Sequence, residues 1–120
     1  MHKIPALLCL LALTLGAKPA LACKVPWFST ASGITSTGYM SAQSGKPCTI
    51  RFVSRGPTES TQIVQRPANG TLRIGSIGRV IYTSRPGFVG SDAFTYVRSG
   101  QHPQGGPSVR TVRISVTVTP

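Results

Sequence analysis

The side chains that most enzymes use for acid–base chemistry are nearly absent from this sequence. Its only carboxylates are Glu59 and Asp92, and beyond residue 22 its only histidine is His102. Catalysis by two carboxylates would need both acids to meet in space, and a thiol nucleophile would need Cys48 beside His102. A tetrahedral metal ion could take its ligands from Cys23, Cys48, His102 and one acid, but the spacing of these residues matches no metal-binding motif. The residues therefore argue against an enzyme and predict no catalytic site, metal or cofactor.

Positive charge dominates the composition. Thirteen Lys and Arg residues stand against two acids, which gives a formal net charge of +11. Lys3 and Lys18 precede residue 22, so the remainder carries about +9, and nine of its eleven cations are arginine. A field of this sign attracts polyanions such as lipopolysaccharide, acidic polysaccharide, anionic lipid headgroups or nucleic acid. The alternative is that the charge only keeps the protein soluble.

Residues 1–22 are typical of a secretory signal peptide. A short basic start is followed by an apolar stretch at residues 6–15, and Ala20 and Ala22 supply small residues for cleavage before Cys23. The apolar stretch is too short to span a bilayer. We expect a mature chain of 98 residues, enough for one domain, in the periplasm or outside the cell.

Two cysteines remain after this cleavage, Cys23 and Cys48. In an oxidising compartment such a pair most simply forms a disulfide, which here would stabilise the fold by about 3 kcal/mol through closure of its loop. Cys23 has a second interpretation, because bacterial lipoproteins are acylated at a cysteine in mature position one. Ala20 and Leu21 stand in the reverse of the usual lipoprotein order. Acylation would leave Cys48 as a free thiol, and we favour the disulfide.

Short β-prone segments separated by turn residues fill the mature chain, and no apolar pattern with a helical period occurs in it. We interpret residues 23–44 as a leading arm, with a short strand near residues 35–41, and residues 45–120 as the folded domain. Cys48, Ile50 and Phe52 alternate with polar neighbours and are assigned to the core. Further strands are predicted at residues 61–65, 71–74, 79–83, 93–98 and 108–119. About seven short antiparallel strands can bury their apolar sides only as an all-β sandwich.

One stretch carries a family resemblance. Residues 66–99 read RPANGTLRIGSIGRVIYTSRPGFVGSDAFTYVRS. This resembles the bacterial Ig-like and cadherin-like repeat domains, whose pattern is roughly PxNGTv…YTPxxGFxGxDsFtY. The resemblance implies an Ig-like β-sandwich, present here as a single copy, that acts as a spacer or a binding module.

The resemblance also implies roles for individual residues. Phe88 is expected to dip into the core, and Asp92 with Tyr96 is expected to form a structural corner like the tyrosine corner of Ig sandwiches. Cadherin-like repeats bind calcium through acidic loops, but the corresponding loops here contain Glu59 as their single acid. Calcium needs several carboxylate oxygens, so calcium binding is not carried over.

The basic surface remains as the candidate site. Alternation points Arg51, Arg73 and Arg79 outward, and in an Ig sandwich their strands lie side by side in one sheet; Arg113 is expected to face outward on the other sheet. Such a cluster suits phosphate, sulfate or carboxylate groups. We therefore expect a non-enzymatic binding or adhesion module for an anionic envelope glycan, lipopolysaccharide or lipid headgroup. The alternative is a structural or protein-interaction module, which could complete a partner's sheet through the long last strand. Nucleic acid is less expected, because secretion removes the usual targets.

Overall fold

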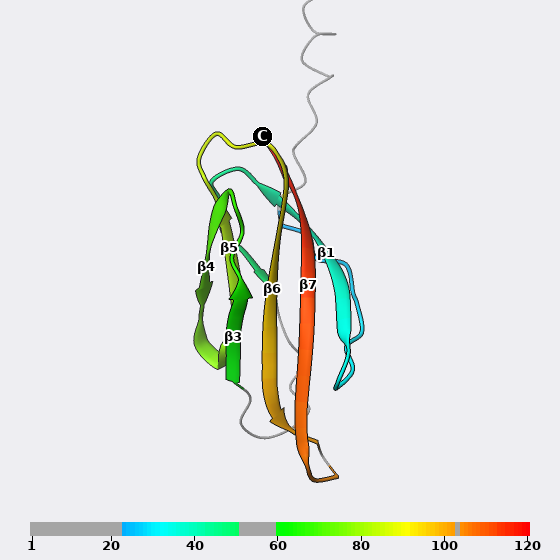
Figure 1. Cartoon of the computed structure of the whole chain (residues 1–120). Coiled ribbons are helices and arrows are strands. Elements are labelled where there is room, and N and C mark those ends of the chain that lie inside the picture. The colour runs from blue at the N-terminus through cyan, green and yellow to red at the C-terminus, as the bar shows by residue number, and fades with distance from the viewer. Residues whose placement is uncertain (1–22, 51–59, 103) are drawn as a thin grey trace, which may run out of the picture.

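A computed structural model of the chain describes residues 23–50, 60–102 and 104–120 (Figure 1). The expected signal peptide lies outside the described residues. The described part contains seven strands and one 3₁₀ helix: β1 (Thr35–Gln43), β2 (Cys48–Ile50), β3 (Ser60–Gln65), β4 (Gly70–Ile74), η1 (Ser76–Gly78), β5 (Val80–Ser84), β6 (Gly90–Gln101) and β7 (Pro107–Thr119).

The strands form two sheets that face each other. One sheet has the order β1-β7-β6-β3 and the other the order β2-β5-β4 (Figure 1). β1 runs parallel to β7, and the remaining pairs are antiparallel. The strands predicted at residues 71–74 and 79–83 are present as β4 and β5, which form a hairpin with η1 in its turn. The prediction of an all-β sandwich is therefore confirmed.

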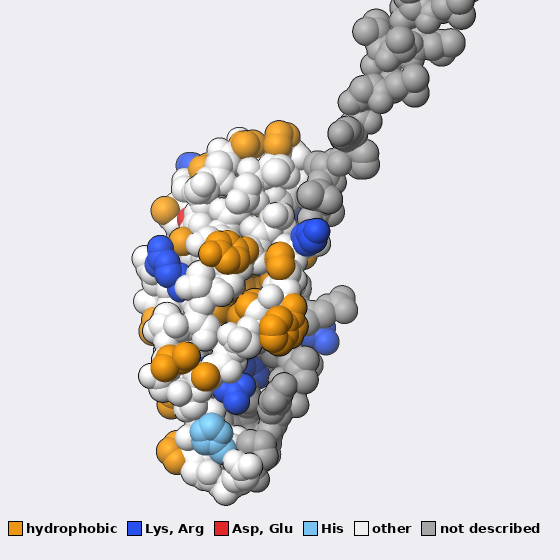
Figure 2. Space-filling view, turned by 90° about the vertical axis from the view of Figure 1, so that its right-hand side faces the viewer, with side chains coloured by type: hydrophobic (Ala, Val, Ile, Leu, Met, Phe, Trp, Pro, Cys, Tyr) orange, Lys and Arg blue, Asp and Glu red, His pale blue; other side chains and the backbone are white. Residues whose placement is uncertain are grey.

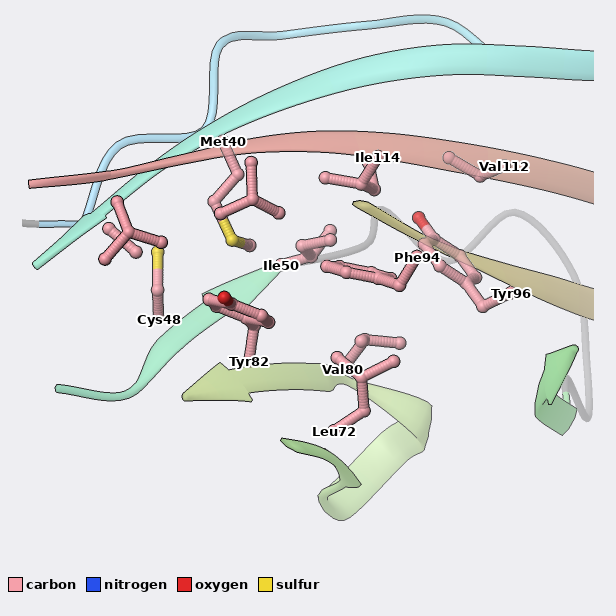
Figure 3. Close-up of a cluster of buried hydrophobic side chains, with 13 residues drawn as sticks. Met40, Cys48, Ile50, Leu72, Val80, Tyr82, Phe94, Tyr96, Val112 and Ile114 are labelled. Carbon is pink, nitrogen blue, oxygen red and sulfur yellow. The ribbon is translucent and has the colours of Figure 1, made fainter. Parts of the chain in front are cut away.

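Alternation along the strands builds the core. Every second residue of β7 is buried, from Val112 to Val118, as the period-two pattern predicts. The aromatic rings of Tyr82, Phe94 and Tyr96 fill the space between the sheets (Figure 3), with 5.8 Å between the ring centroids of Tyr82 and Phe94. Cys48 and Ile50 are buried as expected, whereas Phe52 lies outside the described residues.

The segment that we interpreted as a leading arm supplies part of the sandwich. β1 pairs with β7 from Thr35 to Gln43, and its Met40 and Ala42 side chains are buried in the core. Residues before β1 also pack on the sandwich, since the ring of Phe28 lies over Gly38, where an added Cβ would come within 2.8 Å of it. The sandwich therefore includes residues that we placed before it. The Ser- and Thr-rich composition of β1 hid its inward alternation of Gly38, Met40 and Ala42.

Candidate functional site

Two of the three predicted arginines lie on the outer face of the β2-β5-β4 sheet. Arg73 is exposed in the middle of β4, where its inward-facing neighbour Leu72 is buried. Arg79 precedes β5, and its backbone oxygen accepts a hydrogen bond of 2.8 Å from the Gly75 amide. This bond extends the β4–β5 ladder by one more residue, so Arg79 lies on the same face as Ile81, which is the register partner of Arg73.

The register brings these two side chains within reach of a common ligand. Because Arg73 is opposite Ile81, Arg79 stands diagonally across from it, at a separation of about 7–8 Å in an antiparallel ladder. Two long side chains with planar guanidinium groups can converge on one anion from such positions. Arg51 follows β2 directly and lies outside the described residues. β2 itself is the other neighbour of β5, because Thr49 is also opposite Ile81.

The described residues place no carboxylate against this pair of arginines. Asp92 is the one acid among them; its side chain is 9% exposed and turned into the interior. In Figure 2, which shows the side of the molecule that carries β1, blue basic side chains stand among polar and hydrophobic ones with almost no red. Asp92 being the one acidic side chain among the described residues, these contain no exposed acid that could pair with Arg73 or Arg79.

The Asp92 carboxylate joins both sheets and a turn. It accepts hydrogen bonds from the backbone amides of Ala68 and Asn69, at 3.0 and 3.1 Å, and from the hydroxyl of Tyr82 at 2.8 Å. Its Oδ1 also accepts from the amide of Ala93. Because Asp92 lies near the start of β6 and Tyr82 lies on β5, one side chain fastens the two sheets to the turn before β4. These contacts all lie within the domain, so the role of Asp92 is structural.

Tyr82 is the residue of this network that sequence reasoning missed. The hydroxyl that reaches the Asp92 carboxylate is that of Tyr82. Tyr96 buries its ring beside Phe94, and its role in a tyrosine corner stays a prediction. Burial, followed by the hydrogen bond to the Asp92 carboxylate and its charge, raises the pKa of Tyr82. Burial likewise raises the pKa of Tyr96. The signal in the sequence that could have indicated a role for Tyr82 is its inward position in the alternation of residues 79–83.

The cysteines and the histidine form no catalytic or metal site in the described structure. Cys23 and Cys48 are joined in a disulfide with their Cα atoms 5.1 Å apart, which is the first of the two alternatives considered for Cys23. His102 lies in the β6–β7 turn, where its amide donates to the carbonyl oxygen of Gly106. Among residues 23–50, 60–102 and 104–120, no three His, Cys, Asp or Glu side chains gather as metal ligands would.

The last strand is not free to complete another protein's sheet. β7 is paired with β6 along one edge and with β1 along the other. Just before β1 begins, the Gly33 amide donates to the carbonyl oxygen of Val109, and the Val109 amide donates to the hydroxyl of Ser32. The expectation that this strand could be donated to a partner was therefore wrong, because β7 lies inside its sheet and not at an edge.

Two packed sheets with the orders β1-β7-β6-β3 and β2-β5-β4 define the class of the protein as an immunoglobulin-like β-sandwich. The family model of the bacterial Ig domain matches residues 30–117, a range that includes β1. The chain belongs to the bacterial Ig domain family. No curated protein matches the sequence.

Family membership indicates a non-enzymatic adhesion or interaction module, and domains of this kind are often extracellular or exposed on a surface. Among the residues that the structure describes, no helix has the length and hydrophobicity required to cross a membrane.

Proposed function

We propose that this domain is a secreted or periplasmic binding module that holds an anionic envelope ligand, preferably an acidic glycan, on the outer face of the β2-β5-β4 sheet. The shared ligand chemistry is a carboxylate, sulfate or phosphate group, which a lipid headgroup such as that of lipopolysaccharide also presents. The signal-like residues 1–22 support export of the domain.

The observation that carries the proposal is the register of the β4–β5 hairpin. It sets Arg73 and Arg79 diagonally on one outward face, and the one described acid is turned away from them into the interior. Arginine is the suitable residue for this task because its fixed fork of donors matches two oxygens of one anionic group. Arg73 is exposed and Arg79 is partly exposed, so an extended polymer can reach both from the solvent side.

The test compares two variants of equal net charge. Arg73→Ser with Arg79→Ser removes the proposed face, and Lys46→Ser with Arg66→Ser removes two exposed cations elsewhere. Affinity for immobilised heparin should fall about tenfold in the first variant, since two exposed charge contacts contribute on the order of 0.7 kcal/mol each. The second variant should lose markedly less.

Two results would contradict the proposal. Equal losses in the two double variants would show that only net charge matters, and unchanged heparin binding in the Arg73 and Arg79 variant would exclude the face altogether. Lipid vesicles with and without lipopolysaccharide distinguish a headgroup from a free glycan as the source of the anion. A protein that co-purifies with the domain at high salt would favour the alternative interaction module.

A further inference from the structure

The opposite sheet carries a groove on its outer face that the proposed function does not use. It is a shallow depression, open to solvent, that β1, β6 and β7 line, with a volume of about 590 Å³. The outward side chains that line it are Tyr39, Ser41, Ser91, Ala93, Arg113, Ser115 and Thr117.

Strand register explains why the surface is hollow there. Tyr39 on β1 is opposite Ser115 on β7, which in turn is opposite Ala93 on β6. The next outward row towards the C-terminal end of β7 is equally small, with Ser41, Thr117 and Ser91 in register. The large side chain of Tyr39 therefore stands beside a floor of small and mostly hydroxyl-bearing residues.

Arg113 lines the groove on its β6 side, and its guanidinium is held across β6 towards β3. It lies two residues before Ser115 on β7, so it is the diagonal neighbour of Tyr39. Its guanidinium donates to Gln65 Oε1 at 3.2 Å, and the Thr95 hydroxyl donates to the same oxygen. An arginine fixed across the sheet by a neutral amide keeps its remaining donors for an anion.

The chemistry of this groove fits an acidic sugar. Tyr39 is 62% exposed in the middle of a strand, so its ring offers a flat apolar face on which the C–H side of a sugar ring can stack. Hydroxyls on Ser41, Ser115 and Thr117 can exchange hydrogen bonds with sugar hydroxyls. Arg113 supplies the groove's only outward charge, because the Asp92 carboxylate, the other charged group beside it, is engaged in the interior.

We infer that the Tyr39–Arg113 groove on the β1-β7-β6-β3 sheet binds one acidic sugar unit of a polysaccharide. The inference shares its class of ligand with the proposed function but uses a different site on the opposite sheet, so the two can fail separately. Tyr39 selects a sugar ring, and Arg113 selects its carboxylate or sulfate.

The experiment uses the mature domain and a short oligogalacturonate, with its methyl ester as the uncharged counterpart. Binding is followed by NMR shift changes at moderate salt, which suppresses contacts that depend on charge alone. Tyr39→Ala should weaken oligogalacturonate binding about tenfold, and Tyr39→Phe should restore it because stacking needs only the ring. Arg113→Gln should remove the preference for the acid over the ester. Both residues are exposed, so the variants should keep the melting temperature of the parent domain.

The double change Arg73→Ser with Arg79→Ser provides the matched comparison. It should leave binding in the groove within about twofold, since those residues lie on the other sheet. Loss of all binding in this variant, with Tyr39→Ala unaffected, would overturn the groove while leaving the proposed function intact. The reverse pattern would support the groove and reject the arginine face. Shift changes absent from β1 and β7, or no oligogalacturonate binding at all, would also overturn the inference.

Discussion

Removal of the Asp92 carboxylate should lower the free energy of unfolding more than other substitutions that delete as few atoms. The Asp92→Ala variant leaves the Tyr82 hydroxyl and the amides of Ala68 and Asn69 without the oxygen atoms that they contact at 2.8 to 3.1 Å. A hydrogen bond to a charged acceptor contributes about 1.5–3 kcal/mol, and water can recover part of this at the two partly buried amides. We therefore expect a loss of about 3–5 kcal/mol.

This loss is a large share of the 5–15 kcal/mol that ordinarily stabilises a small domain. It should be measured by urea unfolding followed by far-ultraviolet circular dichroism, because Trp27 is 87% exposed and reports poorly on the core. Tyr82→Phe, which removes one donor and keeps the ring, should cost about 1–2 kcal/mol. The exposed neighbour Ser91 provides the control, since Ser91→Ala should change the free energy of unfolding by less than about 0.5 kcal/mol.

A double-mutant cycle isolates the bond itself. If Asp92 and Tyr82 act through their mutual hydrogen bond, Tyr82→Phe should cost clearly less in an Asp92→Ala background than in the parent domain. A loss below about 1 kcal/mol for Asp92→Ala, or strict additivity in the cycle, would refute the idea that this carboxylate fastens the two sheets.

Three further changes test other parts of the fold. Reduction of the Cys23–Cys48 bond should lower the free energy of unfolding by about 3 kcal/mol in denaturant titrations, and an unchanged midpoint would count against it. Gly38→Ala should cost about 1–2 kcal/mol, because its Cβ would meet the ring of Phe28 at 2.8 Å, and the cost should shrink when Phe28→Leu is also present. Burial raises the pKa values of Tyr82 and Tyr96 in the folded domain, so the unfolded chain releases these two protons at lower pH than the folded domain does. The free energy of unfolding should therefore keep its full value below about pH 10 and should fall as the pH rises further. In thermal melts against pH, this alkaline decline should be shallower when both tyrosines are changed to phenylalanine.

Local patterns in the sequence were sufficient to predict the strands in which apolar and polar residues alternate strongly. The run from Val112 to Val118 predicts its own buried face, and the turn residues at 75–78 predict the hairpin that joins β4 to β5. β1 was underestimated because Ser, Thr and Gly dominate it, and because its parallel partner β7 follows it by more than seventy residues. Local propensity carries no information about such a distant pairing.

Side-chain partners and surface sites depend on the same long-range geometry. The sequence shows that Asp92 is a rare acid at the start of a strand, but the sheet order decides that Tyr82 on β5 meets it. The groove beside Tyr39 is composed from three strands whose small residues are in register only after folding. Outward alternation was enough to place Arg73, whereas the diagonal relation of Arg73 to Arg79 required the register.

The most direct test of the account is an NMR map of the mature domain titrated with a short sulfated heparin oligosaccharide. The account predicts shift changes concentrated on the outer face of β4 and β5 around Arg73 and Arg79, with dispersion elsewhere unchanged and weakening of the complex as salt rises. Shifts spread evenly over every exposed cation, or the absence of any saturable change, would contradict the claim that this sheet face is a binding site.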